Sequence, residues 1–223
     1  MLESREALIL QVLEELSGDI VLIGGYAVNT YVPPRFSIDC DLVVFKGMAG
    51  MKKMLAKNGF EETEKGDVPN GEYIRFMHQR EKVSFDLLVN SVFDRDSKIV
   101  FEGSMFKEYS KERVTVGRAN PIRISMRIAD PELLFAMKFV SARRQDIRDT
   151  FMLSGIELNW NLIREIIKAK CSGEFIKKRI GLIKAKVISK NYRDSLYGAF
   201  GKIPDETFDN CSSNLVKFLG GLT

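Results

Sequence analysis

The stretch that most restricts the possible fold is residues 21–45, which read VLIGGYAVNTYVPPRFSIDCDLVVF. Its pattern predicts a short buried strand at Ile20–Ile23, a tight turn at Gly24-Gly25, and a helix over Tyr26–Tyr31 that ends before two prolines. A second strand is predicted over Ser37–Phe45. Two apolar strands joined by one short helix require a sheet around them, so an all-helical fold is excluded for this part of the chain.

An acidic pair interrupts the second of these strands. Because alternate side chains of a strand share a face, Asp39 and Asp41 point the same way and lie roughly 6–7 Å apart. Burying two like charges without a partner is costly, and a divalent cation between them would remove the repulsion. Hard carboxylate oxygens favour Mg²⁺ or Mn²⁺. Taken alone, an Asp-x-Asp pair is more simply explained by an exposed sheet face.

A third acid and a glycine turn add to this pair. The segments Glu72–His78 and Lys82–Val89 are predicted to form two antiparallel strands, and Asp86 lies inside the apolar run of the second. If this hairpin lies next to the Asp-x-Asp strand, Asp86 reaches the same metal; the alternative is a hydrogen-bonded core aspartate. The strand-Gly-Gly-helix arrangement exposes backbone N–H groups where an anion could dock.

The pattern of the chain changes near residue 128. Before it, predicted strands, which include Val114–Val116 and Ile122–Met126, alternate with predicted helices over Ser4–Leu16 and Met48–Lys57, the second of which is closed by Gly59. After it, Asp130-Pro131 marks a helix start, and helical periodicity continues to Leu219. The sequence therefore predicts an α+β fold, with a mixed sheet flanked by helices over residues 1–128 and an all-helical part over residues 129–223.

Composition excludes several kinds of chemistry. The 223 residues include a single histidine, His78, and three widely spaced cysteines, so a two-histidine metal site, a Ser-His relay and a zinc cluster are all disfavoured. No apolar run approaches the ~20 residues of a membrane helix, and charges stand where a signal peptide would be apolar. We expect a cytoplasmic protein without a membrane segment that works through carboxylates, lysines, arginines and backbone groups.

The net charge of +4 is unevenly distributed. Residues 164–193 hold ten basic and two acidic side chains, whereas the rest of the chain is slightly acidic. Such a segment is either a solvated helix face or a site for a polyanion, because clustered positive charge releases counterions from a phosphate backbone.

Together, Gly-Gly, a thirteen-residue spacer, Asp-x-Asp and a later strand aspartate resemble the nucleotidyltransferase superfamily related to DNA polymerase beta. More narrowly, GGYA…RFSIDCDLVV is similar to the Arg-x-[Ser/Thr]-x-Asp-x-Asp version found in the toxin-type, AbiEii-like nucleotidyltransferases of abortive-infection systems. The segment DPELLFAMKFVSARRQDIRD at 130–149 is similar to a helix pair of that group. The resemblance covers about residues 20–150.

The resemblance implies roles for seven positions. Asp39 and Asp41 would hold the metals, and Asp86 would complete the acceptor-side metal or act as a base. The nucleotide triphosphate would be contacted by four further residues: Gly24, Gly25, Arg35 and Lys138. Plainer alternatives remain, since Arg35 could pair with an acid and Lys138 could be the solvent edge of its helix. Asp146 and Asp149, with Arg144, would form either an orienting network or a surface ion-pair set.

The implied reaction is transfer of a nucleoside monophosphate from an NTP, ATP among them, to an acceptor hydroxyl, with Mg²⁺ or Mn²⁺ as cofactor. The basic segment 164–193 favours RNA such as tRNA as the acceptor, while a protein hydroxyl and a small molecule remain open. Two alternatives compete with this function: a catalytically silent nucleotide-binding or toxin-antitoxin module, and a two-metal nuclease. The sequence does not determine the oligomeric state.

Overall fold

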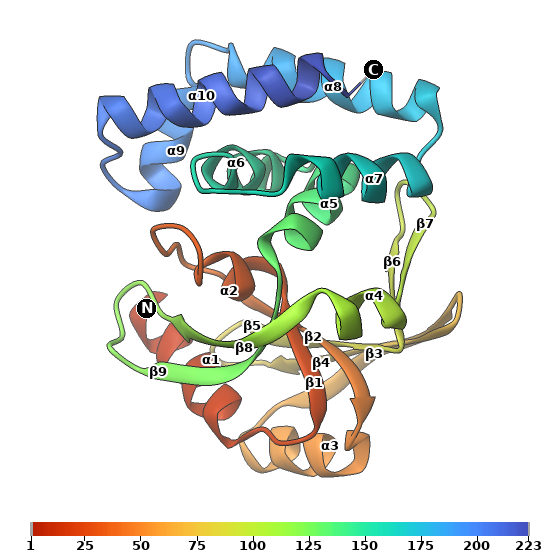
Figure 1. Cartoon of the computed structure of the whole chain (residues 1–223). Helices are drawn as coiled ribbons and strands as arrows, with labels where there is room; N and C mark the ends of the chain where they lie inside the picture. Colours follow the sequence, from red (N-terminus) through yellow and green to blue (C-terminus); the bar gives the residue numbers. More distant parts are fainter. Residues whose placement is uncertain (1, 223) are drawn as a thin grey trace. The chain divides into compact units, whose positions relative to one another are not determined.

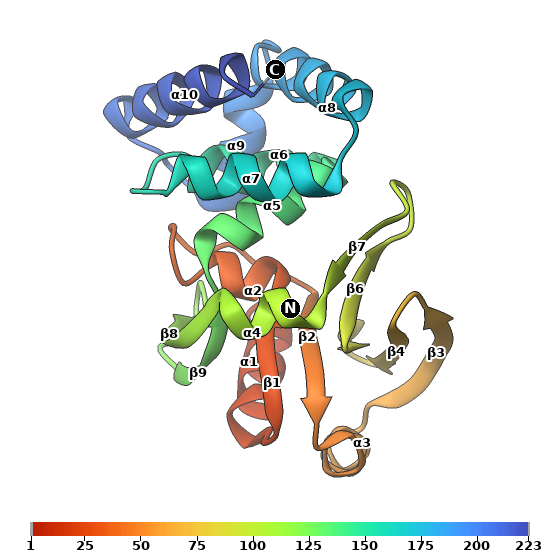
Figure 2. The same cartoon turned by 45° about the vertical axis from the view of Figure 1, so that its right-hand side comes forward.

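The computed structural model describes residues 2–222, which form two compact units. The first unit runs to Phe93 and resumes over Val100–Asp130. The second contains Asp94–Ile99 and the chain from Pro131 onward. Figures 1 and 2 show strands concentrated in the first unit and helices in the second.

A seven-stranded sheet with the order β3-β4-β5-β2-β1-β9-β8 forms the centre of the first unit. It is mixed, because β2 pairs with β5 and β1 with β9 in parallel, while the other neighbours are antiparallel. The strands are β1 (Asp19–Ile23), β2 (Asp39–Lys46), β3 (Glu61–Val68), β4 (Gly71–His78), β5 (Val83–Val89), β8 (Ser110–Val116) and β9 (Arg123–Ala129). The predicted α+β class is thereby confirmed.

Burial alternates over Asp39–Leu42 at the start of the central strand β2, and Val43 and Val44 that follow are both buried. Cys40, Leu42 and Val44 are almost completely buried on one face, whereas Asp39 and Asp41 are only partly buried on the other. The first unit also contains the helices α1 (Leu2–Glu15), α2 (Gly24–Val28), α3 (Met48–Lys57) and α4 (Gly103–Glu108). The face that carries Cys40 and Leu42 therefore belongs to the core, and the partly buried acids at the start of β2 lie on the other face.

The glycine pair differs from its prediction. Gly24 and Gly25 are the first two residues of α2 and not a turn before it, and the helix ends at Val28, three residues earlier than expected. The side chain of Asn29 explains the early end: it donates to the carbonyl of Arg35 at 2.9 Å and accepts from the Arg35 N–H at 3.0 Å. This pair of bonds fixes the loop that leads into β2.

Three strands were not predicted from the pattern. The edge strand β3 reads EETEKGDV and is exposed over most of its length, so it carries no alternation of apolar residues. The short strands β6 (Ser91–Asp94) and β7 (Ile99–Glu102) form a separate two-stranded sheet. These strands form because their backbones pair with a neighbouring strand, and the pattern of side chains does not predict that pairing.

The second unit is helical after Pro131, which confirms the predicted change of pattern. Its helices are α5 (Pro131–Ser141), α6 (Arg144–Leu153), α7 (Trp160–Lys170), α8 (Gly173–Val187), α9 (Tyr192–Phe200) and α10 (Asp205–Gly220). Phe135 of α5 packs edge-on against Trp160 and Phe218, with ring centroids 5.5 and 5.2 Å away. Among the helices of residues 2–222, none combines the length and apolar character needed to cross a bilayer.

Candidate functional site

The sheet register sets the predicted acids side by side. In the parallel pair β2–β5, Asp41 lies opposite Asp86 and Asp39 lies opposite Ser84. Because neighbouring strands are ~4.8 Å apart, residues directly opposite each other project together from one face. Asp39, Asp41 and Asp86 thus occupy two adjacent rows on the polar face of the sheet.

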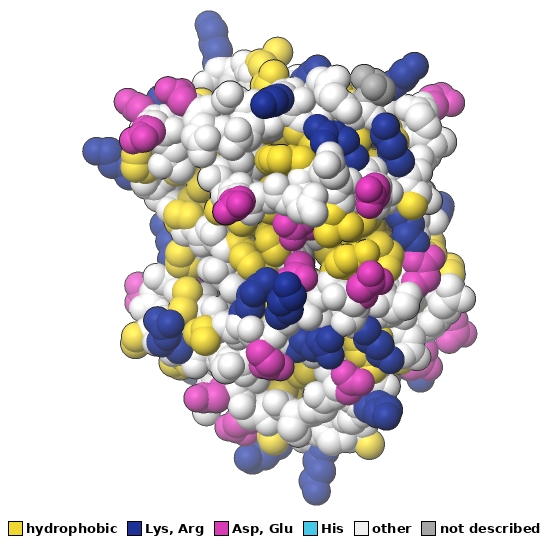
Figure 3. Space-filling view, in the orientation of Figure 1, with side chains coloured by type: hydrophobic (Ala, Val, Ile, Leu, Met, Phe, Trp, Pro, Cys, Tyr) yellow, Lys and Arg dark blue, Asp and Glu magenta, His cyan; other side chains and the backbone are white. Residues whose placement is uncertain are grey.

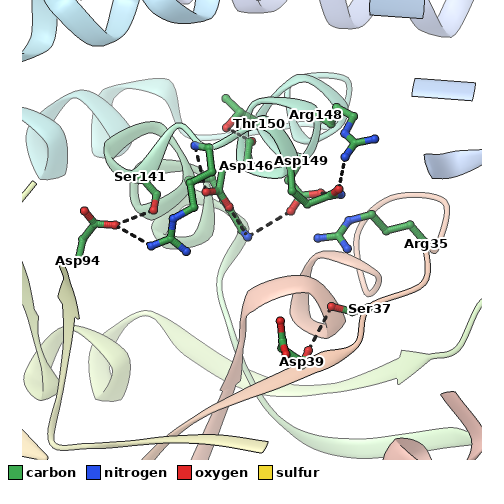
Figure 4. A network of polar contacts seen from close by, with 12 residues as sticks. Arg35, Ser37, Asp39, Asp94, Ser141, Asp146, Arg148, Asp149 and Thr150 are labelled. Carbon is green, nitrogen blue, oxygen red and sulfur yellow. Dashed lines mark hydrogen bonds and ion pairs between the residues drawn. The ribbon is translucent and has the colours of Figure 1, made fainter. Parts of the chain in front are cut away.

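Asp39 is fixed by a hydroxyl from the neighbouring strand. Ser84 Oγ donates to Asp39 Oδ1 at 2.7 Å, and Ser37 Oγ donates to the Asp39 carbonyl at 3.1 Å. Figure 4 shows the Ser37 contact beside the Asp39 side chain. Both serines come from strands or loops that the register holds in place, so the Asp39 carboxylate is oriented before any ligand arrives.

Asp86 is held by an arginine that the sequence reasoning did not single out. Arg75 lies opposite Asp86 in the antiparallel pair β4–β5, and its Nε and Nη2 reach the two carboxylate oxygens at 2.8 and 2.7 Å. The hydrogen bond to Asp86 raises the pKa of the Arg75 guanidinium above its ordinary value. Across residues 2–222, no group of three or more His, Cys, Asp or Glu side chains is set to hold a metal ion.

The two glycines lie against residues from the following loop and strand. Gly24 has a φ of +68°, and a Cβ atom there would lie 1.9 Å from Asp41 Oδ2. A Cβ atom on Gly25 would lie 2.7 Å from Ser37 Oγ and 3.0 Å from Arg35 Nη2. A side chain at position 24 would therefore displace the acid, and the space above Gly25 is filled by a hydroxyl and a guanidinium.

Arg35 is 5% exposed, which is unusual for an arginine outside a site or a buried network. Its Nη1 donates to the carbonyl of Phe36 at 3.1 Å, and its backbone is fixed by Asn29. The structure thus brings Arg35 and Ser37 to the glycine pair. Ser37 is a second residue to which the sequence reasoning gave no role, although it stands at the Ser/Thr position of the quoted motif.

Lys138 lies in the second unit, inside a network of buried acids. Its Nζ contacts Asp146 Oδ1 at 2.8 Å and Asp149 Oδ2 at 3.2 Å, and its side chain is 14% exposed. Asp146 and Asp149 are themselves buried, and Figure 4 shows them side by side on α6. The alternatives of a solvent-edge lysine and of a surface ion-pair set are therefore wrong for these three residues, whereas Arg144 is exposed.

Part of the basic segment forms an exposed face on α8. Lys177, Lys178 and Lys184 are exposed, and so are the apolar side chains of Leu182 and Ile188. On the face of the molecule in Figure 3, Lys and Arg side chains lie beside apolar ones over the helices of the second unit. The charge that the sequence places here is thus accessible to a partner.

Solved structures share this fold. The chain superposes with a TM-score of 0.51 and 18% identity on JHP933 from Helicobacter pylori, covering 99% of this chain and 93% of that one. A protein described as a candidate nucleotidyltransferase from H. pylori gives a TM-score of 0.50 and 18% identity, with 99% and 95% covered. No family model matches the chain, and a search of curated proteins finds no relative. The chain therefore shares the overall fold of these two structures.

Proposed function

We propose that this protein is a metal-dependent nucleotidyltransferase that moves a nucleoside monophosphate from an NTP to an acceptor hydroxyl and releases pyrophosphate. The observation that supports it is the register of β2 and β5, which sets Asp41 opposite Asp86, together with the close approach of Gly24 to Asp41. Carboxylates from two strands beside a glycine pair are suited to phosphoryl transfer from a nucleotide.

The donor set fits Mg²⁺ or Mn²⁺ in kind. Asp39 and Asp41 offer hard oxygens from one strand, and the Ser84 hydroxyl keeps the Asp39 carboxylate in place. When bound, the metal supplies charge neutralisation for the triphosphate and activation of the hydroxyl. Asp86 completes this set only when one of its oxygens turns from Arg75, since both accept from that guanidinium here.

Two groups of residues are proposed to contact the triphosphate. Gly24 and Gly25 offer backbone N–H groups, and the guanidinium of Arg35 and the hydroxyl of Ser37 adjoin Gly25. Lys138 is a further proposed contact, carried over from the resemblance, and Asp146 and Asp149 hold its ammonium group here. These residues bind and orient the leaving pyrophosphate, while the carboxylates act at the α-phosphorus.

The step itself balances without another reactant. The acceptor oxygen forms a bond to the α-phosphorus, the bond to the bridging oxygen of the β-phosphate breaks, and pyrophosphate leaves with that electron pair. Asp86 lies where it could accept the hydroxyl proton, since it is adjacent to Asp41 on the face opposite the core.

RNA, with tRNA as the leading case, is the acceptor we propose. The exposed lysines of α8, Lys177, Lys178 and Lys184, offer charge for a phosphate backbone. Reversing these three charges should weaken RNA binding and flatten its dependence on salt, because each phosphate contact contributes to the slope. An unchanged slope would remove RNA from the proposal and leave a protein or small-molecule acceptor.

One observation favours a second candidate, a catalytically silent nucleotide-binding module of the kind found in toxin-antitoxin pairs. Arg75 engages both oxygens of Asp86, and a site that keeps this ion pair throughout would bind a nucleotide without transferring it. Membership of the AbiEii-like group is likewise a proposal, carried by the residues of the Arg35–Asp41 motif.

The test is incubation of the purified protein with each labelled NTP, Mg²⁺ and bulk tRNA. Label on the RNA, dependent on Mg²⁺, is the expected result. Retention of NTP without incorporation would support the silent module, and shortened RNA would point to a nuclease. A denaturing gel shows labelled or shortened RNA, and filter binding of the labelled NTP shows retention.

A further inference from the structure

Three charged residues follow one line across the neighbouring strands β2, β5 and β4, and Gly24 of α2 adjoins its β2 end. Along this line Gly24 adjoins Asp41, Asp41 lies opposite Asp86, and Asp86 lies opposite Arg75. Directly opposite residues share a face, so the groups are spatial neighbours in the order Gly24 (α2), Asp41 (β2), Asp86 (β5) and Arg75 (β4).

If the proposed function holds, one end of this line faces the leaving pyrophosphate and the other end faces the acceptor hydroxyl. Phosphoryl transfer places the attacking and leaving oxygens roughly in line on either side of the phosphorus. If the leaving pyrophosphate lies at the Gly24 end, the acceptor hydroxyl must approach from the Asp86 end. Arg75 is the next residue beyond Asp86, so it faces whatever part of the acceptor adjoins that hydroxyl.

Arg75 has the exposure and the chemistry of a ligand contact. Its side chain is 31% exposed, against 9% for that of Asp86, so a ligand can reach the guanidinium more easily than the acid. The ring of Tyr73, two residues along β4, lies 6.0 Å from the guanidinium carbon and borders the same patch. The planar fork that now spans two carboxylate oxygens has the same complementarity to a phosphate.

We infer that Arg75 recognises a phosphate next to the acceptor hydroxyl, and that the Asp86 pair is where the guanidinium rests before the acceptor binds. When the acceptor phosphate replaces the Asp86 carboxylate on Arg75, the guanidinium stays paired. The Asp86 carboxylate is then released to act in the transfer. The acceptor class that follows is a hydroxyl with a neighbouring phosphodiester, as at the 3′ end of RNA.

The test measures binding of a fluorescent RNA hairpin with a single-stranded 3′ end, in the presence of Mg²⁺. Two versions differ only in the last linkage, which is a phosphodiester or a neutral methylphosphonate. The wild-type protein should bind the phosphodiester RNA about tenfold more tightly. Arg75→Gln should reduce that ratio to below about twofold, while Arg80→Gln, which removes an exposed arginine from the turn after β4, should keep it.

A second variant protects the test against misfolding. Arg75→Gln leaves Asp86 without its partner, whereas the double change Arg75→Gln with Asp86→Asn removes both charges and preserves shape. Loss of the preference for the phosphodiester RNA in both the single and the double variant supports the inference. The inference would be overturned if Arg75→Gln kept the tenfold preference for the phosphodiester RNA. It would also be overturned if the wild-type protein bound the two RNAs equally.

The two proposals fail separately. Binding that discriminates through Arg75, without transfer of labelled nucleotide, would contradict the nucleotidyltransferase function and leave an RNA-end contact. Transfer to RNA without discrimination would contradict only the role of Arg75.

Discussion

Two clusters of acids, one in each unit, show how similar residues can be placed for different purposes. In the first unit, Asp41 and Asp86 lie on neighbouring strands, and Arg75 engages one of them from a third strand. In the second, the ammonium group of Lys138 bridges two buried carboxylates on the next helix.

The difference lies in what fixes each cluster. The second cluster spans residues 138–149 on two consecutive helices, so local chain geometry is sufficient to assemble it. The first spans residues 24–86 and depends on sheet register, and its members are only partly buried, apart from Asp86. A local, buried cluster is suited to rigidity, whereas a partly exposed row of like charges is suited to a cation and a nucleotide.

Removing an acid from the exposed row should have the largest effect, and it should fall on activity. Asp41→Asn is expected to lower nucleotide transfer by at least ~10³-fold, since about 4 kcal/mol of transition-state stabilisation is lost with a metal ligand. The free energy of unfolding should stay the same or rise, because repulsion from Asp86 decreases. Transfer at the wild-type rate would contradict the mechanism.

The buried cluster should respond in the opposite way. Lys138→Met leaves Asp146 and Asp149 buried without this ammonium group, so the free energy of unfolding should fall by about 3 kcal/mol. Denaturant unfolding measures this change, and Lys168→Met on an exposed face of α7 is the matched control. Equal stability of the two variants would show that the network is not structural.

The first glycine of α2 allows a smaller comparison inside the first unit. Gly24→Ala should lower the free energy of unfolding by about 2 kcal/mol, because φ is +68° and the new Cβ would meet Asp41. Gly50→Ala, at a helical position in α3 with open space around it, should stabilise by about 0.5–1 kcal/mol. A lower unfolding temperature for Gly24→Ala and a higher one for Gly50→Ala would support the placement of Gly24 against the acid. Equal shifts in the two variants would contradict it.

Cysteine alkylation gives the smallest expected effect. It compares a fully buried thiol in the first unit with a half-buried thiol in the second. Burial raises the pKa of Cys171 to about 11, so its thiolate is scarce at pH 7 and alkylation should rise about tenfold per pH unit between pH 7 and 9. Cys40 lies between the two acids of β2 and is fully buried, and its pKa is raised first by burial and then by those acids. Cys40 should react only when the first unit opens; alkylation of Cys40 faster than Cys171 would contradict this burial.

Much of the fold follows from local pattern, and the missing parts share one cause. Apolar alternation predicts β2, β4 and β5, and helical periodicity predicts α1, α3 and α5, because each of these elements buries one side. The edge strand β3 buries little and leaves no such pattern. The helix end at Val28 depends on the side-chain hydrogen bonds of Asn29 to the backbone of Arg35, which hydrophobic periodicity does not predict.

The candidate site divides in the same way. Asp39, Asp41 and Asp86 stand out because each is an acid in an apolar strand. Arg75 is an ordinary residue of a half-exposed strand, and only the pairing of β4 with β5 shows that it faces Asp86. Counting across the predicted hairpin would have been the one available signal, and it requires the exact turn register.

Metal binding tests the central claim that the row on β2 and β5 is a metal site. Titration of the protein with Mn²⁺, followed by electron paramagnetic resonance, should give a bound signal for the wild-type protein and for Asp67→Asn, which removes an exposed acid from β3. Asp39→Asn and Asp41→Asn should each weaken Mn²⁺ binding at least about tenfold without lowering the temperature of thermal unfolding. Equal Mn²⁺ affinity in the wild-type and Asp41→Asn proteins would contradict the account.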